Sequence, residues 1–223
     1  MVFMGNPGTG KTTVARLLAG LYCAIGVLSK GQLVEVDRSG LVAGFVGQTA
    51  QKTAEVINRA IGGVLFIDEA YSLTSKEGND FGQEAVETLL KAMEDNRDNL
   101  IVIVAGYEDL MEDFINSNPG LSSRFNRYFI FEDYTSGELF DIFKSLCSKN
   151  MYTLDANADE FAAEYFKAMY ENRSENFGNG RDVRNFFESS VSAHSDRVSQ
   201  LESPTREELM TLLREDLENA AAQ

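Results

Sequence analysis

The stretch Gly5-Asn6-Pro7-Gly8-Thr9-Gly10-Lys11-Thr12 fits the pattern G-x-x-x-x-G-K-[ST]. It follows a short apolar run at residues 2–4 and opens a segment in which apolar residues recur at helical spacing as far as residue 25. Glycines let backbone amides approach a phosphate group, and the positive end of the following helix points at the same place. We therefore predict a phosphate-binding loop, the Walker A motif, between a strand and a helix.

The residues of this loop have distinct expected roles. Lys11 is expected to reach the β and γ phosphates, and the hydroxyl of Thr12 to ligate Mg²⁺. The remaining residues are expected to line the bound nucleotide: Asn6, Pro7, Gly8, Thr9, Gly10 and Thr13. A glycine-rich turn without a ligand is the alternative, and the strand before the loop and the helix after it both count against that alternative.

An acidic pair follows a second apolar run. Residues 64–69 read Val-Leu-Phe-Ile-Asp68-Glu69. Acids after a strand often do no more than cap the next helix, but downstream of a phosphate loop they indicate catalysis. Asp68 is expected to hold Mg²⁺ through water, and Glu69 to orient and deprotonate an attacking water molecule. The guanine-reading motif Asn-Lys-x-Asp is absent from the sequence, so ATP is the expected nucleotide.

The first 133 residues alternate short apolar runs with helical patterns, which is typical of a parallel α/β sheet. The uniformly apolar run at 64–67 fits a strand buried on both faces. We predict the three-layer parallel sheet of a P-loop NTPase, as an α/β nucleotide-binding domain at residues 1–133. The further strands are expected at residues 33–36, 100–105 and 128–131, and helices at 50–61 and around 86–93.

The strand signals stop after residue 133, and a small all-helical lid domain is predicted at residues 134–223. Thr135 and Glu138 have the spacing of a capping box, as do Thr205 and Glu208. The second box is expected to open the last helix. Two more helices are expected near residues 158–170 and 182–198.

Charge and composition exclude several classes of protein. The 223 residues are 43% hydrophobic and 25% charged, and their net charge is −15. Such a field repels phosphate groups, so no nucleic acid and no membrane partner is expected. No apolar run is long enough to cross a bilayer, and the N-terminus has no basic, apolar signal sequence, so a cytoplasmic protein is expected.

Cysteine and histidine offer no second chemistry. Cys23 and Cys147 lie far apart in apolar helical patterns, so buried thiols in a reducing compartment are expected. His194 is the single histidine and is expected to be a surface or packing residue rather than a metal ligand or base. Neither a metal-ligand cluster nor a Ser/His/Asp triad is evident in the sequence.

Five motifs in order carry a resemblance to a known family. They are the loop at residues 5–12, Phe45-Val46-Gly47, Asp68-Glu69, Asn118-Pro-Gly-Leu-Ser-Ser-Arg124-Phe, and Gly178-Asn-Gly-Arg181-Asp-Val-Arg184-Asn. Together they resemble an AAA+ ATPase module. The most similar group contains red-type Rubisco activases, stage V sporulation protein K and the ATPase domains of type VII secretion chaperones. The resemblance covers nearly the whole chain.

The resemblance implies roles for several arginines. Arg124 matches the arginine finger, which completes the active site of the neighbouring subunit and stabilises charge on the γ-phosphoryl group. Arg127 is the nearby alternative, and a plain surface arginine is a second one. Arg181 matches the sensor-2 arginine of the lid, which reaches the γ-phosphate. Arg184 either shares that task or pairs with an acid, and pairing with a local acid is also the alternative for Arg181.

Phe45, Val46 and Gly47 match the aromatic pore loop of ring-forming motors. An aromatic side chain between Gly44 and Gly47 can swing and grip a polypeptide backbone without reading its side chains. The alternative is that Phe45 packs into the core.

Two departures from the family pattern stand out. Tyr107 occupies the position where many members carry a sensor-1 Asn or Thr, so it is expected to contact the nucleotide through a longer side chain. Only four residues precede Gly5, so the segment that usually surrounds adenine is missing. Adenine contacts are expected from the lid, a neighbouring subunit or a preceding segment, as in a module of a longer protein.

The resulting hypothesis is an ATPase that binds ATP and Mg²⁺ at subunit interfaces of a homo-oligomeric ring, expected to be a hexamer, and remodels or threads a protein substrate. One alternative is an assembly or scaffold switch that responds to nucleotide without threading anything. A DNA-associated loader or branch-migration motor is a third hypothesis, and the charge of −15 disfavours it.

Overall fold

The structure is a computed structural model that describes residues 1–45, 47–74 and 81–222. By their contacts, these residues form two compact units. The first unit comprises Met1–Gly5 and Gly10–Phe131, and the second comprises Asn6–Thr9 and Glu132–Gln223. Each unit has a hydrophobic core of its own, so each is described by itself.

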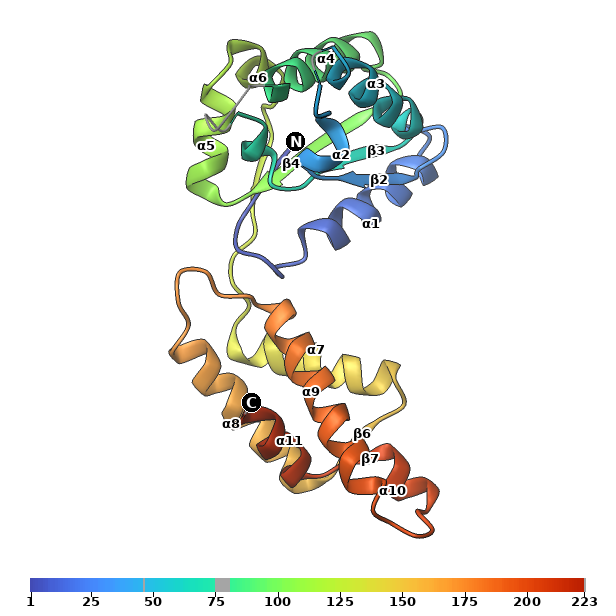
Figure 1. Cartoon of the computed structure of the whole chain (residues 1–223), viewed down its shortest axis with the longest axis vertical. Coiled ribbons are helices and arrows are strands. Elements are labelled where there is room, and N and C mark those ends of the chain that lie inside the picture. Colours follow the sequence, from blue (N-terminus) through green and yellow to red (C-terminus); the bar gives the residue numbers. More distant parts are fainter. Residues whose placement is uncertain (46, 75–80, 223) are drawn as a thin grey trace. The chain divides into compact units, whose positions relative to one another are not determined.

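The first unit is built on a five-stranded, fully parallel sheet (Figure 1). Its spatial order is β2-β3-β4-β1-β5, so the first strand lies inside the sheet and the second at one edge. The predicted parallel sheet is confirmed. The strands are β1 (Val2–Met4), β2 (Leu33–Val36), β3 (Val64–Ile67), β4 (Ile101–Gly106) and β5 (Tyr128–Ile130).

Alternate residues of the inner strands face opposite cores. Leu65 and Ile67 of β3 join the larger core, whereas Val64 and Phe66 join the smaller one. Both sets are fully buried, because helices cover both faces of the sheet and leave no solvated side. The larger core packs under α2 (Arg38–Leu41), α3 (Thr49–Ala60), η1 (Ala70–Thr74), α4 (Phe81–Asp95), α5 (Glu108–Asn116) and α6 (Pro119–Arg124).

The smaller core packs under α1 (Lys11–Ala24). This helix lies against the sheet through its alanines, Ala15 and Ala19, which are fully buried. The larger apolar residues whose spacing predicts the helix are less buried, and Leu17 is 68% exposed. Cys23 is half-exposed rather than buried, which corrects the prediction for that thiol.

The second unit contains five helices and one pair of strands within the part of the chain that is described. The helices are α7 (Ser136–Lys149), α8 (Ala156–Glu171), α9 (Gly180–Val198), α10 (Arg206–Met210) and α11 (Arg214–Ala221). Both predicted capping boxes are confirmed, because the Thr135 and Thr205 hydroxyls each accept a hydrogen bond from the amide of the glutamate three residues on.

The lid also contains a pair of two-residue parallel strands, which no pattern in the sequence predicts. β6 (Thr153–Leu154) pairs with β7 (Thr211–Leu212), and the Thr153 and Thr211 hydroxyl oxygens lie 3.2 Å apart. The second capping box therefore opens the short α10 and not the last helix, because β7 intervenes before α11. This pairing joins residues 58 positions apart, so no local pattern announces it.

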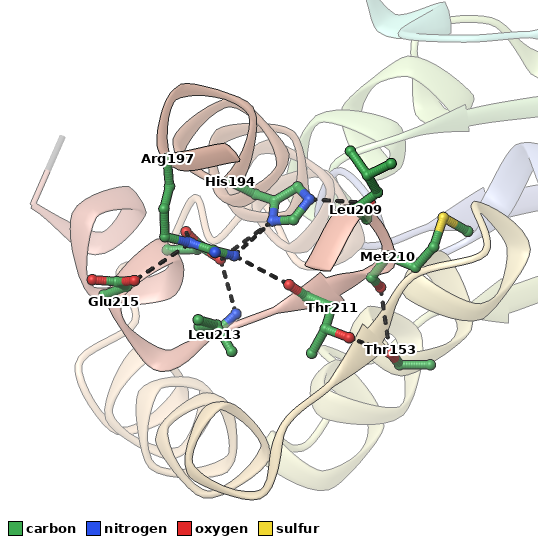
Figure 2. A network of polar contacts seen from close by, with 9 residues as sticks. Thr153, His194, Arg197, Leu209, Met210, Thr211, Leu213 and Glu215 are labelled. Carbon is green, nitrogen blue, oxygen red and sulfur yellow. Dashed lines mark hydrogen bonds and ion pairs between the residues drawn. The ribbon is translucent and has the colours of Figure 1, made fainter. Parts of the chain in front are cut away.

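A buried polar network holds α9, β7 and α11 together (Figure 2). We call His194, Arg197 and Asp216 the lid network. Arg197 donates two hydrogen bonds of 2.8 Å to the Asp216 carboxylate and one of 3.2 Å to the Thr211 carbonyl. Asp216 also accepts from the Leu213 amide, which secures the first turn of α11.

His194 is a packing residue of this network, as predicted. It is 4% exposed, its Nε2 lies 3.2 Å from the Leu209 carbonyl, and its Nδ1 lies 2.9 Å from Arg197 Nη2. A carbonyl only accepts and a guanidinium only donates, so Nε2 carries the proton and Nδ1 accepts. Nearby, Cys147 is buried, and burial raises the pKa of its thiol to about 12, which suits an inert core residue.

Among the helices that are described, none combines the length and the apolar character that a membrane span needs.

Candidate functional site

The predicted site residues of the first unit gather at the carboxyl edge of its sheet. The phosphate loop follows β1, Asp68 follows β3, and Tyr107 follows β4, which lies between those two strands. The Gly5 amide donates a 3.1 Å hydrogen bond to the Gly106 carbonyl, so the start of the loop is fixed to the end of β4. Ligands of open parallel sheets bind at this edge.

The start of α1 is built to receive an anion. Its N-cap is Gly10, with φ 93°, and no side chain caps the first turn. The first turn also contains no acidic residue. The first amides of the helix and its positive end therefore face outward without a competing carboxylate, in the manner of phosphate-binding helices.

Lys11 and Thr12 stand on that first turn, and both are half-buried. The Lys11 ammonium donates a 2.8 Å hydrogen bond to the Gly5 carbonyl, so its side chain folds back over the loop. An ammonium held there is in place to meet the charge of a triphosphate. The predicted role of Lys11 thus agrees with the direction of its side chain.

Asp68 and Glu69 form the turn after β3. Asp68 is half-buried, and its carboxylate accepts a 3.1 Å hydrogen bond from the Glu69 amide. Glu69 is exposed and has a φ of 48°, in the left-handed region that non-glycine residues rarely adopt. Such a backbone costs on the order of 1 kcal/mol and is commonly found at functional sites.

The aromatic ring of Tyr107 lies near η1, because its centroid is 6.4 Å from that of Tyr71. Burial raises the pKa of Tyr71 above its usual range, and the charges of Glu69, Tyr107 and Asp68 raise it further. Tyr71 therefore lies close to both Tyr107 and the acidic pair, and the sensor-1 role of Tyr107 stays a prediction.

The donor set suits a magnesium nucleotide. The Thr12 hydroxyl and the Asp68 carboxylate supply the oxygen atoms that Mg²⁺ prefers. No cluster of three or more His, Cys, Asp or Glu that would bind a metal ion by itself occurs among the residues placed in the structure. Mg²⁺ commonly uses few protein ligands together with phosphate oxygens.

The central part of the loop, Asn6–Thr9, belongs to the second unit by its contacts. The Asn6 amide donates to Asp133 at 3.0 Å, the Gly180 amide donates to the Gly8 carbonyl at 3.2 Å, and the Tyr134 hydroxyl donates to the Thr9 carbonyl at 3.1 Å. A Cβ on Gly8 would lie 2.1 Å from the Gly178 carbonyl oxygen, so only glycine fits at this approach.

Two residues of this arrangement escaped the sequence analysis. Asn179 is fully buried, and its amide donates a 2.7 Å hydrogen bond to the same Asp133 oxygen that Asn6 contacts. Asp133 therefore joins the phosphate loop to the start of α9. Asp133 and Asn179 lie 46 residues apart in the sequence. The Gly-Asn-Gly sequence around Asn179 is the one local pattern that marks this contact.

The four arginines named in the sequence analysis are divided between the two units. Arg181 and Arg184 are exposed near the start of α9, and the Arg181 amide lies 2.7 Å from where a Gly8 Cβ would stand. Arg124 ends α6 and forms a 3.3 Å ion pair with Glu94. Arg127 is exposed just beyond α6.

One feature distinguishes Arg124 from a plain surface arginine. Its Nε is buried and has no hydrogen-bond partner among the described residues. Leaving a buried donor unpaired costs about 1–3 kcal/mol. The role of Arg124 as an arginine finger stays a prediction.

The pore-loop residues lie between α2 and α3. Phe45 is 72% exposed, so the alternative in which it packs into the core is not supported. A Cβ built on Gly44 or on Gly47 would meet nothing within 4 Å, so open space surrounds both ends of the loop. Val46 lies outside the described residues.

Comparison with known proteins identifies both units. Residues 1–133 match the family described as ATPase family associated with various cellular activities (AAA), and residues 135–223 match the AAA lid domain.

Three relatives illustrate the similarity. The chain is 44% identical over 218 residues to stage V sporulation protein K of Bacillus subtilis, covering 97% of the chain and 68% of that protein. It is 49% identical over 186 residues to protein CbbX of Cereibacter sphaeroides, covering 83% and 60%. It is 41% identical over 220 residues to the chloroplastic ribulose bisphosphate carboxylase/oxygenase activase of Cyanidioschyzon merolae, covering 97% and 74%. The chain thus spans only part of each relative.

Solved structures agree on the fold. The AAA domain of FIGL-1 superposes with a TM-score of 0.66 at 17% identity, covering 99% of this chain and 69% of that one. The same domain in complex with ADP gives a TM-score of 0.67 at 18% identity, covering 99% and 70%. At this identity the likeness establishes the architecture only.

Proposed function

Because the chain belongs to the AAA family of ATPases and is therefore an ATP hydrolase, we propose that it hydrolyses ATP with Mg²⁺ between identical subunits of a ring and uses the energy to remodel or thread a protein substrate. The observation that carries the hydrolytic part is the carboxyl edge of the sheet. There, the uncapped helix start with Lys11 follows β1 and the Asp68-Glu69 turn follows β3, the two strands that flank β4 in one sheet.

In this proposal the chain's own groups divide the work. The loop amides and Lys11 hold the phosphates, and Thr12 and Asp68 hold the Mg²⁺ that neutralises them. Glu69 takes the proton of the attacking water, for which its exposed carboxylate is suited. Tyr107, Arg181 and Arg184 contact the nucleotide from β4 and α9. When bound, Mg²⁺ supplies charge stabilisation of the triphosphate.

The ring is proposed on the basis of Arg124. Its unpaired Nε and its place at the end of α6 support the role proposed for it, which is to complete the active site of a neighbouring subunit. A hexamer in the cytoplasm is the expected form. The division into a nucleotide-binding domain at residues 1–133 and a lid at 134–223 is part of the same proposal.

The protein substrate is proposed on the basis of the exposed Phe45 loop. The relatives include a protein named as an activase of ribulose bisphosphate carboxylase/oxygenase, which supports a protein as the substrate class. The net charge of −15 supports neither a nucleic acid nor an anionic membrane as a partner.

A subunit-mixing experiment tests the shared active site. Arg124→Ala and Glu69→Gln are each expected to be inactive alone. Their mixture is expected to recover part of the ATPase activity, because an Arg124→Ala subunit keeps Glu69 and its Glu69→Gln neighbour supplies Arg124. Arg127→Ala serves as the control and is expected to stay active. Absence of recovery in mixed oligomers that native mass spectrometry detects would contradict action between subunits.

A second experiment tests the protein substrate against the scaffold alternative. Phe45→Ala is expected to keep ATPase activity and oligomerisation but to lose the capture of an unfolded, fluorescently labelled polypeptide. Phe129→Ala on the exposed β5 is the matched control. Equal capture by Phe45→Ala and the wild-type chain would favour a nucleotide-dependent switch that threads nothing.

A further inference from the structure

Arg38 begins α2, immediately after the N-cap Asp37, and stands on the segment that leads from β2 to the Phe45 loop. It is half-buried, and no motif in the sequence singles it out. Its guanidinium does not remain at α2. Arg38 Nη1 donates a hydrogen bond of 2.5 Å to the Ser72 carbonyl, 34 residues further along the chain.

Ser72 belongs to η1, the short helix that directly follows the acidic turn. The Ser72 amide in turn donates a 2.9 Å hydrogen bond to the carbonyl of Glu69. Arg38 is therefore two hydrogen bonds away from the backbone of Glu69. That backbone has the left-handed φ of 48°, a conformation that persists only where its surroundings hold it.

The packing around the guanidinium leaves no room for a larger neighbour. A Cβ on Gly82 of α4 would lie 2.8 Å from Arg38 Nη1 and 1.9 Å from the Leu73 carbonyl oxygen. Gly82 is itself buried. The Arg38 head group is thus enclosed between η1 and the start of α4, where a bond to a backbone carbonyl keeps its orientation.

The helix that carries Arg38, α2, is itself held in place by hydrogen bonds from α3. The Lys52 ammonium donates to the carbonyls of Ser39 at 2.7 Å and Val42 at 3.0 Å, and the Thr53 hydroxyl donates to the Leu41 carbonyl at 3.1 Å. These bonds tie α2 to α3. Arg38 therefore extends from a secured helix and not from a loose loop.

Arg38 and Glu69 line the same cavity of about 510 Å³, together with Ser72 and with Gly44 at the base of the Phe45 loop. Arg38 and Glu69 are therefore neighbours around one space.

We propose that Arg38 is a positioning residue for hydrolysis, which holds the η1 turn so that the Glu69 carboxylate is directed at the attacking water. The inference rests on the proposed role of Glu69 as the base. Arg38 itself touches neither nucleotide nor water in this account, and it acts through Ser72 and the backbone of Glu69.

The test compares Arg38→Met, which keeps the apolar stem but loses the charge and the donor, with Arg38→Lys, which keeps both. Arg59→Met is the matched control, since Arg59 is an exposed arginine on α3 of the same unit. For each variant, kcat, the dissociation constant for Mg²⁺-ATP, and the hydrogen exchange of amides 69–74 are measured beside the wild-type chain and Glu69→Gln.

We expect Arg38→Met to lower kcat by about 10- to 100-fold, the usual effect of a misplaced catalytic group, with the dissociation constant changed less than about twofold. Amides 69–74 are expected to exchange faster, Arg38→Lys to recover most of the activity, and Arg59→Met to match the wild-type chain. A general loss of folding would instead weaken ATP binding and accelerate exchange throughout the first unit.

Unchanged kcat in Arg38→Met, or exchange of amides 69–74 as slow as in the wild-type chain, would overturn the inference. Failure of the proposed function looks different, because Glu69→Gln would then hydrolyse ATP as fast as the wild-type chain. The exchange measurement still decides in that case whether Arg38 holds the turn.

Discussion

Two groups of polar residues in this protein differ in their burial and in their partners. The lid network is buried, with Asp216 1% exposed, and the Asp216 carboxylate is matched by the Arg197 cation, which also donates to His194 Nδ1. The edge cluster, by which we mean Lys11, Thr12, Asp68 and Glu69, lies at the open edge of a sheet, and its glutamate is exposed. Matched and buried groups stabilise the lid, whereas exposed groups on a constrained backbone are arranged for a ligand.

This contrast predicts that the two groups respond differently to mutation. A change in the edge cluster is expected to alter catalysis and leave the stability of the fold intact. A change in the lid network is expected to do the reverse, because its members contact one another and no predicted catalytic residue.

The largest expected effect is on catalysis. Glu69→Gln keeps the size of the side chain but removes the base, so kcat is expected to fall about 10²- to 10⁴-fold. The midpoint of thermal unfolding is expected to stay near the wild-type value, because the side chain is exposed and keeps its shape. Coupled phosphate-release assays and calorimetric scanning check the two halves. Glu87→Gln on the exposed side of α4 is the control, and brisk hydrolysis by Glu69→Gln would remove it from the role of base.

The next effect is on stability. Asp216→Asn leaves the Arg197 cation and the buried His194 without their carboxylate, and the loss of one partner from a buried pair costs about 3–5 kcal/mol. Urea unfolding followed by circular dichroism measures this loss. Glu218→Gln in the exposed ion pair with Arg214 is the matched control on the same helix and is expected to cost less than about 1 kcal/mol. Equal costs for the two variants would contradict the structural role of the lid network.

Acid is expected to weaken the lid. Burial alone would raise the pKa of Asp216, but hydrogen bonds from Arg197 and the Leu213 amide, with the charge of Arg197, hold it below its usual range. A lowered folded-state pKa contributes stability that is complete above the unfolded value of about 4 and is lost as pH falls below it. Unfolding free energies between pH 6 and pH 3 are therefore expected to fall for the wild-type chain and to be flatter for Asp216→Asn.

The smallest expected effect concerns the boundary of the lid. The Thr135 hydroxyl accepts from the Glu138 amide, and the Glu138 carboxylate accepts from the Thr135 amide at 2.8 Å. Thr135→Ala is expected to cost about 1 kcal/mol, the usual value of a lost N-cap. Thr135→Ser keeps the cap and is the control. A cost as large as that of Asp216→Asn would show that this cap does more than close the first turn of α7.

The sequence predicts those features that depend on near neighbours. The phosphate loop, the acidic pair and both capping boxes are patterns of eight residues or fewer, so spacing alone identifies them. The parallel sheet is equally accessible, because strands such as β3 are uniformly apolar when helices cover both faces.

The features that the sequence conceals depend on distant partners. Asp216 is one of 35 acidic residues, and no pattern in the sequence distinguishes it from the others. Its partner Arg197 is 19 residues away and meets it only in the folded lid. The same holds for Asp133 and Asn179 at the loop, and for the reach of Arg38 to Ser72. The spacing of the apolar residues in α1 predicts the helix correctly but not the face that it buries. The sheet contacts the small Ala15 and Ala19, and Leu17 stays exposed.

The most direct test of the account is calorimetric titration of folded Glu69→Gln with Mg²⁺-ATP, with Lys11→Ala as the comparison. The account predicts saturable heat with one nucleotide bound per chain for Glu69→Gln, and no saturable heat for Lys11→Ala. If Glu69→Gln unfolds like the wild-type chain yet takes up no nucleotide, or if Lys11→Ala binds ATP equally well, the edge of the sheet is not the site of ATP hydrolysis.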